Sequence, residues 1–584
     1  MPTLLQTIDK LTKDKLKQFE HLFPGINFSG RKDEMVAAIM LEYQGTGLLN
    51  LWRHMDNLQQ TAVAETLYNK NGFLDFQKFR AKYGKSPAFS FKGNRGDQAT
   101  ALALFLFQDE GAYCIPLDLH EPLKAFVSAP KSGRLKSEQA LPDAPSASPF
   151  VVRAMENEAL SDLPRLLRLV EQGKVKVSDK SKLPGAATTQ LLTNHLSNGD
   201  FYAEPPRKYT WEQEIGAIKA FAWPMLLQAG GLTQQEGAKL ALSRAGIKAL
   251  STPPAEVLRS LWSKWLKNTL LDEFSRVDVI KGQKSKGRVM AAVPPRRAAI
   301  DQALRQCPVG DWIHIDEFGR FMRAEDMNFT LSHNPWQLYI SDANYGALGY
   351  QGGWEVLELH YVLVLLFEYA APLGMIDIAY INPEDARNDF HGLWGIDDLR
   401  FLSRYDGLVY FRLTELGAYC LGLRDHYTPC RPPSTLKLSI LPSLHINVTD
   451  GQPSIEEALL LETWATQETE TAWQLDQTRA TVAVEQGHDI SLLHHFLTAS
   501  EDQTLPDSVE AFIKTVAQQG GALKTVANAV LIECANAEIA RLIAGHKETA
   551  KLCLPAGPRH LAVRTDHAEK FRIALHILGF GWKI

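Results

Sequence analysis

Cysteine is scarce in this sequence, and its placement excludes two common kinds of site. Six cysteines are spread over 584 residues, and no two of them form a C-x-x-C pair. Zinc ribbons and dithiol redox sites both need cysteines at such short spacing, so neither is indicated. Sparse, unpaired cysteines are typical of a reducing compartment, and we therefore expect a cytoplasmic protein.

Long hydrophobic runs are also absent. The most apolar segment, residues 361–381, is interrupted by Glu368, Pro372 and Asp377. A membrane-spanning helix needs about 20 predominantly apolar residues, so we predict a buried helix, a turn and a strand here instead. The opening residues, MPTLLQTIDKLTKDKLKQF, contain acids and lysines but no apolar core of signal-peptide length. The sequence therefore predicts neither a membrane span nor an export signal.

The sequence has no motif for nucleotide hydrolysis. A phosphate-binding loop has the form G-x-x-x-x-G-K-[ST], and the only Gly-Lys-Ser triplet begins at Gly84. Phe79 occupies the position of the first glycine, and Pro87 would block the helix that must follow. The segment WIHIDEF, residues 312–318, is similar to the acidic strand of ATPases. Because the phosphate-binding loop is missing, we expect its two acids to cap the next helix.

Other catalytic signatures are missing as well. There is no H-E-x-x-H zinc motif and no G-x-S-x-G nucleophile elbow. Asp389, His391, Asp397 and Asp398 are close in sequence and could hold a cation, although roles in loops and helix caps explain them better. We therefore expect no metal, no cofactor and no catalytic residue, with a metal-dependent nuclease as the remaining enzymatic alternative.

Positive charge is not in excess over the whole chain, which carries 62 Lys and Arg against 67 Asp and Glu. A protein that coats nucleic acid would be strongly basic, so any such contact must come from local patches. The strongest patch is VIKGQKSKGRVMAAVPPRR, residues 279–297, which contains no acid after Asp278. We predict that its basic residues contact phosphates: Lys281, Lys284, Lys286, Arg288, Arg296 and Arg297. A solvated loop that contacts nothing is the alternative.

The first 128 residues are expected to form short helices. Two helices on either side of Pro24-Gly25 resemble a SAP-type helix pair, which in its family binds DNA; a helical hairpin packed on its neighbour is the alternative. Two further helices around Gly72 suggest a helix-turn-helix core. Residues 129–149 contain four prolines and four serines, as is typical of a linker, so we place a domain boundary there.

The region 150–340 has the pattern of a winged helix-turn-helix. A leucine-rich helix from Ser161 precedes the alternating segment 174–177, and Pro184 suits the first turn of another helix. Such a fold presents one helix to the major groove and a wing to the backbone, so we predict Lys174 and Lys176 as wing contacts. The chain is expected to be helical over 211–274.

The region 341–436 is a second candidate for the same fold. The expected order is a long apolar helix at 354–369, a short helix over IDDLRFLSRYDG at 396–407, a strand at 408–413 and a last helix capped by Thr414. In the final region, 437–584, strands are expected at 438–448, 530–532 and 561–563. An amphipathic helix is expected between them, over LPDSVEAFIKTVAQQGG at 505–521.

Four segments of the final region, in order, resemble the helicase-associated domain found beside XPB-type helicases and in bacterial proteins without a motor. They are residues 438–448, 472–487, 505–521 and 561–581. The L-P-x-x-V that opens a helix in that family is present as Leu505-Pro506 with Val509, and its final G-F pair as Gly579-Phe580. In contrast, the segment 474–476 reads Gln-Leu-Asp where the family has Arg-Leu-Thr, and Leu441-Pro442-Ser443 keeps only the proline of a Q-P-D turn. The resemblance implies DNA engagement or docking to a helicase, not unwinding.

Together these features predict a mainly α, α+β protein of tandem winged helix-turn-helix modules followed by a small α+β helicase-associated domain. The expected domains are 1–128, a linker at 129–149, 150–340, 341–436 and 437–584. The predicted function is non-catalytic DNA binding or helicase assistance, in DNA repair or in defence against foreign DNA. Duplex or forked DNA and a separate helicase or nuclease are the expected partners, and a membrane is not. The alternative is a scaffold whose winged helices assemble a helicase or nuclease complex, which the net charge of -5 fits better than DNA binding.

Overall fold

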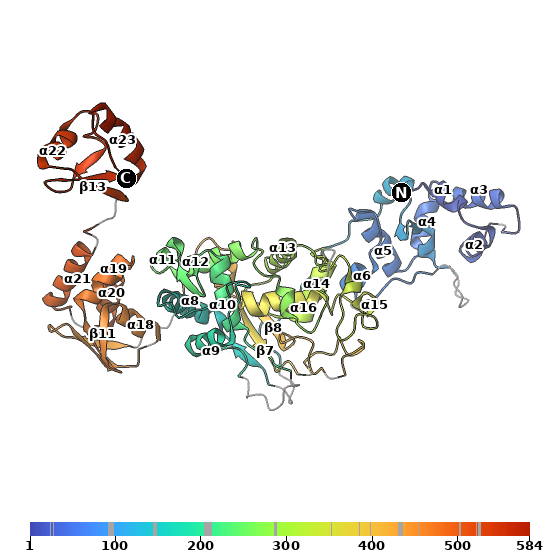
Figure 1. Ribbon diagram of the computed structural model, residues 1–584. Coiled ribbons are helices and arrows are strands. Elements are labelled where there is room, and N and C mark those ends of the chain that lie inside the picture. Colours follow the sequence, from blue (N-terminus) through green and yellow to red (C-terminus); the bar gives the residue numbers. More distant parts are fainter. Residues whose placement is uncertain are drawn as a thin grey trace. The chain divides into compact units, whose positions relative to one another are not determined.

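The computed structural model describes residues 1–584 apart from 24, 27, 91–98, 144–148, 204–212, 285–288, 352, 385, 398, 430–435, 454, 502–503, 521, 524–526 and 584. The chain divides into two compact units, Met1–Ser434 with Ser454–Leu459, and Thr435–Pro453 with Leu460–Ile584. Helices make up most of the regular structure, and the strands form several small antiparallel sheets (Figure 1). The fold is therefore mixed α+β, as the sequence predicts.

The N-terminal region of the first unit consists of short helices and one hairpin. Its elements are α1 (Leu4–Asp9), α2 (Lys13–Lys17), α3 (Lys32–Glu42), α4 (Gly47–Arg53), α5 (Asn57–Tyr68), α6 (Phe76–Tyr83), η2 (Ala101–Leu104), β1 (Phe107–Asp109), β2 (Ala112–Cys114) and α7 (His120–Lys124). Asp56 and Asp75 cap α5 and α6 by accepting first-turn N–H groups. Gly84 ends α6 in the left-handed conformation, and so it terminates a helix as a C-terminal glycine commonly does.

The rest of the first unit is built around one large apolar core. Its elements are β3 (Val151–Arg153), α8 (Met155–Glu171), α9 (Ala186–His195), α10 (Lys219–Ala229), β4 (Thr233–Glu236), β5 (Lys239–Leu242), α11 (Arg244–Ala249), α12 (Pro254–Trp265), α13 (Val293–Leu304), β6 (Trp312–His314), α14 (Ile315–Ala324), α15 (Leu348–Gln351), α16 (Glu358–Val364), η6 (Leu365–Ala370), β7 (Ile376–Tyr380), β8 (Leu408–Leu413) and α17 (Glu415–Cys420). Strands β3, β7, β8 and β6 form one sheet in that order. Helix, turn and strand over 361–381 are confirmed by α16, η6 and β7.

Three segments of this unit share one order of elements and one strand pairing. In each, a helix, a short extended strand, a second helix and a third helical stretch precede a pair of antiparallel strands, and the second strand of that pair also pairs with the short strand. The segments run from α5 to β2, where Phe73 pairs with Cys114; from α8 to β5, where Lys176 pairs with Lys239; and from α13 to β8, where β6 pairs with β8. The third segment has two additions: η5 (Pro335–Gln337) and α15 follow its second helix, and residues 381–407 join its two strands in place of a tight turn. The sequence predicts a repeated helix-turn-helix order, whereas the strand pairing that the three segments share is seen only in the structure.

Two predicted helices are wrong. The hairpin β4–β5 interrupts the expected helical run at 211–274; its turn contains Gly237, which has a positive φ of 60°. The expected helix at 396–407 does not form in the described part of that segment. There the buried carboxylate of Asp406 accepts the backbone N–H groups of Leu402 and Ser403, at 3.0 Å each, and so competes with helical hydrogen bonds.

The second unit contains two small sheets. Its elements are β9 (Lys437–Ile440), β10 (His445–Asp450), the part of α18 (Ile455–Trp464) from residue 460 on, β11 (Ala465–Thr469), β12 (Ala472–Leu475), α19 (Gln477–Glu485), α20 (Ile490–Ser500), α21 (Asp507–Gln519), β13 (Ala529–Glu533), α22 (Ala537–Gly545), β14 (Cys553–Pro555), β15 (His560–Arg564) and α23 (Ala568–Ile577). The sheet orders are β11-β12-β10-β9 and β13-β15-β14. Helix α21 confirms the predicted amphipathic helix, since Val509, Phe512, Ile513 and Val516 are its buried residues.

No membrane-spanning helix is present in the part of the chain that the structure describes. Among those residues, no helix combines the length and the apolar character that a bilayer crossing needs.

Candidate nucleic-acid interface

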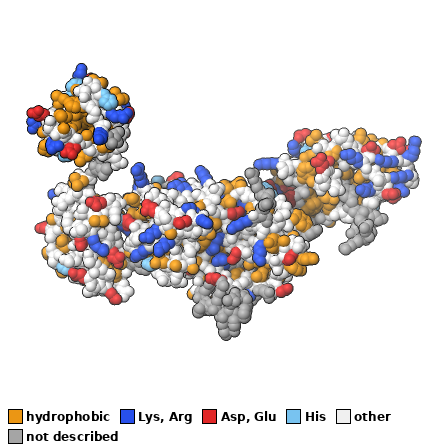
Figure 2. All heavy atoms as spheres, viewed as in Figure 1, with side chains coloured by type: hydrophobic (Ala, Val, Ile, Leu, Met, Phe, Trp, Pro, Cys, Tyr) orange, Lys and Arg blue, Asp and Glu red, His pale blue; other side chains and the backbone are white. Residues whose placement is uncertain are grey.

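The basic segment at 279–297 is divided between exposed and buried side chains. Lys281 and Lys284 are exposed, whereas Lys286 and Arg288 lie outside the described residues. The backbone N–H of Lys281 donates to the carbonyl of Tyr339 at 2.7 Å, which attaches the start of the segment to the chain at 337–339. Figure 2 shows basic side chains on the visible face of the molecule, interleaved with acidic ones. Two of the six predicted contacts are therefore exposed among the described residues.

Arg296 and Arg297 must be removed from the predicted phosphate contacts, because both are buried in the first turn of α13. The guanidinium of Arg296 lies 2.9 Å from the carboxylate of Asp272, and that of Arg297 lies 2.5 Å from Glu273. Arg297 also donates to the carbonyls of Asn268 and Leu271. These arginines satisfy buried carboxylates and carbonyls and are not available to a polyanion.

Glu273 is the centre of this buried cluster. Besides Arg297, the indole N–H of Trp265 and the hydroxyl of Tyr361 donate to its carboxylate, each at 2.9 Å. Burial raises the pKa of Glu273 above its ordinary value, and the Arg297 guanidinium offsets only part of that rise. The cluster holds the segment before α13 against α12 and α16, so its role is structural.

The predicted wing lysines lie on one side of a small sheet. Lys174 and Lys176 are exposed, while Val175 and Val177 between and beyond them are buried, as an alternating strand requires. Lys176 is directly opposite Lys239 of β5, so sequence reasoning missed a third lysine of this edge. Glu236 faces Lys239 across the hairpin and offsets part of the positive charge.

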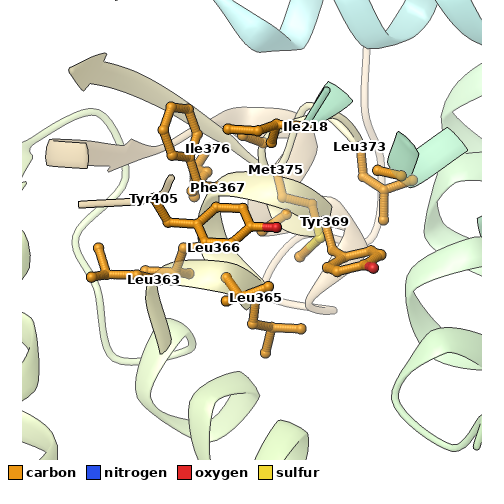
Figure 3. Packing of buried hydrophobic residues seen from close by; sticks show 14 of the residues in the cluster. Ile218, Leu363, Leu365, Leu366, Phe367, Tyr369, Leu373, Met375, Ile376 and Tyr405 are labelled. Atoms are coloured by element: carbon orange, nitrogen blue, oxygen red, sulfur yellow. The ribbon is translucent and has the colours of Figure 1, made fainter. Parts of the chain in front are cut away.

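The third helical stretches of the two larger repeated segments are buried. Helix α10 is buried from Lys219 to Leu227, and every residue of η6 is buried. The two stretches pack against each other, and Figure 3 shows Ile218, at the start of α10, beside Phe367 of η6. Neither helix presents a face that could enter a DNA groove.

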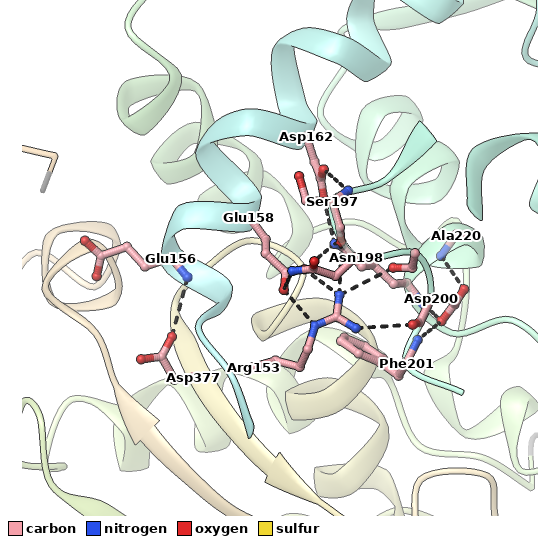
Figure 4. A network of polar contacts seen from close by, with 12 residues as sticks. Arg153, Glu156, Glu158, Asp162, Ser197, Asn198, Asp200, Phe201, Ala220 and Asp377 are labelled. Carbon is pink, nitrogen blue, oxygen red and sulfur yellow. Dashed lines mark hydrogen bonds and ion pairs between the residues drawn. The ribbon is translucent and has the colours of Figure 1, made fainter. Parts of the chain in front are cut away.

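A second buried charge network fixes the start of α10 (Figure 4). The ammonium of Lys219 lies 2.5 Å from Glu158 and 2.6 Å from Asp162, both on α8. Arg153 pairs with Glu158 at 2.6 Å, and Asp200 accepts N–H groups at the N-terminus of α10. Burial alone would raise the pKa of Glu158, but Arg153 and Lys219 hold it below its ordinary value. Because these charges pair with one another, the network orients α10 within the core.

The acids considered for a metal or for catalysis have structural partners. Arg387 lies 2.7 Å from both Asp316 and Asp389, and Glu317 pairs with Arg320 within α14. Asp316 and Glu317 stand in the first turn of α14, but the predicted capping role is wrong, because His314 is the N-cap. Asp397 is exposed, and Asp398 lies outside the described residues. Among the residues that are described, no three His, Cys, Asp or Glu side chains are grouped to hold a metal ion.

Comparison of the chain with protein-family models and with curated proteins finds no match. The assignment of a function therefore depends on the geometry described above.

Proposed function

We propose that the protein is a non-catalytic DNA-binding protein that assists a separate helicase. The observation that supports this proposal best is the repeated order helix, strand, helix, helix, antiparallel strand pair, with the first strand paired to the last. This is the order of a winged helix-turn-helix, and we interpret the three segments as three such modules. The second unit, with its two small sheets, would then be the helicase-associated domain that its sequence resembles.

The burial of α10 and η6 decides how such modules could contact DNA. A winged helix that reads bases places one helix in the major groove, and these two helices are enclosed in the core. Contacts would then come from wings and loops. Contacts of this kind reach phosphates and carry little sequence information, so we propose binding without base specificity.

The lysines that remain accessible are the candidates for these contacts. They are Lys174, Lys176 and Lys239 at the wing, and Lys281 and Lys284 in the basic segment. Each ammonium that contacts a phosphate releases a condensed counterion, which makes the affinity depend steeply on salt.

Fluorescence anisotropy with labelled DNA over a range of salt concentrations tests the proposal. For the double variant Lys281→Gln/Lys284→Gln we expect weaker binding and a slope of log K against log salt that is shallower by about 1 or more. The matched control is Lys32→Gln/Lys124→Gln, which removes the same charge from lysines already paired with Asp9 and Glu121. Equal slopes for wild type and the Lys281/Lys284 variant would remove this segment from the interface.

A protein scaffold is the second candidate, and one observation favours it. Leu531, Ala562 and Leu554 form a row across the β13-β15-β14 sheet, and the two leucines are 63% and 71% exposed. An exposed aliphatic row suits a protein surface better than a polyanion. Absence of binding to duplex, forked and single-stranded DNA at low salt would favour the scaffold.

DNA cleavage with magnesium or manganese would instead indicate the nuclease alternative. Loss of that cleavage in Asp397→Ala would assign it to this acid.

A further inference from the structure

Three large aromatic side chains are exposed on neighbouring loops of the first unit. Trp336 is 48% exposed, Tyr345 is 77% exposed and Trp394 is 48% exposed. Tyr345 and Trp394 are 49 residues apart in the sequence, yet their ring centroids are only 5.9 Å apart. Exposed aromatic residues cost solvation free energy, so a group of them suggests a surface that is covered by a ligand.

The two indole rings are supported from one side by glycines of a single short segment. A Cβ atom at Gly349 would lie 2.3 Å from Cδ2 of Trp336, and one at Gly346 would lie 3.2 Å from Cε3 of Trp394. Each ring therefore packs on backbone and leaves about half of its surface open. Rings held in place before a ligand arrives lose little conformational entropy on stacking.

The backbone of Lys281, at the start of the basic segment, pairs with the stretch of chain between Trp336 and Tyr345. Lys281 and Tyr339 exchange backbone hydrogen bonds of 2.7 and 3.3 Å, and Gly282 lies directly against the carbonyl of Gln337, the neighbour of Trp336. Tyr339 in turn pairs with Ala347, two residues after Tyr345. Of the nearby acids, Asp342 accepts the N–H of Asn344 in its own turn, and Asp397 is exposed. Backbone pairing thus places the start of the basic segment next to the stretch of chain that carries Trp336 and Tyr345.

We propose that this surface, formed by Trp336, Tyr345, Trp394, Lys281 and Lys284, binds single-stranded DNA. Unpaired bases can stack on open aromatic rings while lysines contact the phosphates, whereas the bases of a duplex are already stacked on one another. The burial of α10 and η6, which removes groove recognition, points in the same direction. The inference rests on the proposed DNA-binding function and specifies its ligand.

The test compares, by anisotropy at low salt, the binding of a labelled oligothymidylate of about 20 nucleotides with that of a duplex of equal length. Oligothymidylate is chosen because it has little structure of its own. Each of its bases can stack on an aromatic ring through its π-face. We expect tighter binding of the single strand, accompanied by quenching of tryptophan fluorescence. Tyr345→Ala and Trp394→Ala should each raise the dissociation constant for the single strand about fivefold or more and leave that for the duplex unchanged. Trp394→Phe keeps a ring and should retain most of the affinity.

The outcomes separate this inference from the proposed function. Tyr345 is largely exposed, so Tyr345→Ala keeps the test valid even where Trp394→Ala lowers the thermal stability. Unchanged single-strand affinity in both alanine variants, with weaker binding in Lys281→Gln/Lys284→Gln, would overturn the aromatic surface and leave DNA binding in place. Tighter binding of the duplex than of the single strand would likewise overturn the inference alone. Failure of every DNA form to bind would overturn both.

Discussion

At the scale of single residues, the basic side chains of one segment have opposite roles. Lys281 and Lys284 are exposed, but Arg296 and Arg297 are buried against Asp272 and Glu273. The carboxylates lie 24 residues earlier in the chain, so a local count of charge finds a basic run where the fold has ion pairs. Arginine suits such sites, because its planar guanidinium can satisfy a carboxylate and several carbonyls together.

Glu358 on α16 gives a prediction for the dependence of stability on pH. Burial raises the pKa of its carboxyl to about 7 in the folded protein, against an ordinary value of 4.5. The unfolded chain therefore loses this proton at lower pH than the folded chain, and ionised Glu358 lowers the free energy of unfolding as pH rises through this range. The free energy of unfolding of Glu358→Gln should therefore rise relative to that of wild type as the pH increases from 4.5 to 7. At pH 8 the full difference, up to roughly 3 kcal/mol, is expected.

Urea unfolding of both proteins at pH 5 and pH 8 measures this difference directly. Glu256→Gln, at an exposed position of α12, is the matched control for the change of residue type. A difference between Glu358→Gln and wild type that stays constant from pH 5 to pH 8 would contradict the proposed effect of burial.

At the scale of elements, tertiary contacts override local helical and strand patterns. The segment 396–407 has helical spacing of apolar residues, yet Asp406 binds two of its backbone N–H groups and pairs with His360 of α16 at 3.1 Å. The polar strand β4 has no strand-like alternation, yet it pairs with β5 along its full length. Distant contacts then support each conformation: His360 pairs with Asp406, and Lys176 pairs with Lys239 of the β4–β5 hairpin.

Asp406→Ala tests the first of these cases. The substitution leaves two backbone N–H groups without their acceptor and His360 buried without its carboxylate, so we expect a loss of about 3 kcal/mol or more in the free energy of unfolding. Hydrogen exchange at the amides of Leu402 and Ser403 should also become faster. Asp316→Ala, which removes an exposed carboxylate paired with Arg387, should cost less than about 1 kcal/mol. Equal losses in the two variants would show that Asp406 has no special role.

At the scale of the whole molecule, the chain contains several apolar cores instead of one. The N-terminal region, the rest of the first unit and the part of the second unit around Phe571 each have a core of their own. Domains with separate cores can unfold in separate transitions. A substitution that damages one core should then leave the others intact.

Phe571→Ala tests this independence by differential scanning calorimetry of the full chain. Phe571 is fully buried, and truncation of such a side chain typically costs about 3–5 kcal/mol. We expect one transition to move to a lower temperature and the transition of the first unit to stay in place. Ile577→Ala, at a residue that is 70% exposed on α23, should shift neither. Parallel shifts of all transitions after Phe571→Ala would indicate a single cooperative molecule.

The sequence predicted correctly where a pattern acts locally. Alternation at 174–177 and helical spacing at 507–519 each place apolar side chains on one face, and the structure buries those faces. The α+β class follows from the same two periodicities. The strand pairings within the repeated segments and the role of Lys239 could not be predicted, because they depend on which strands pair across tens of residues.

The sequence by itself determined that this protein is an α+β chain without a phosphate-binding loop, and that its basic residues are concentrated in short segments. Only the tertiary structure decided which of those residues are exposed, that α10 and η6 are buried against each other, that Tyr345 and Trp394 are neighbours, and that Lys281 pairs with Tyr339. The physical reason is that periodicity and charge are properties of neighbouring residues. Burial and pairing, in contrast, depend on segments that only folding brings together.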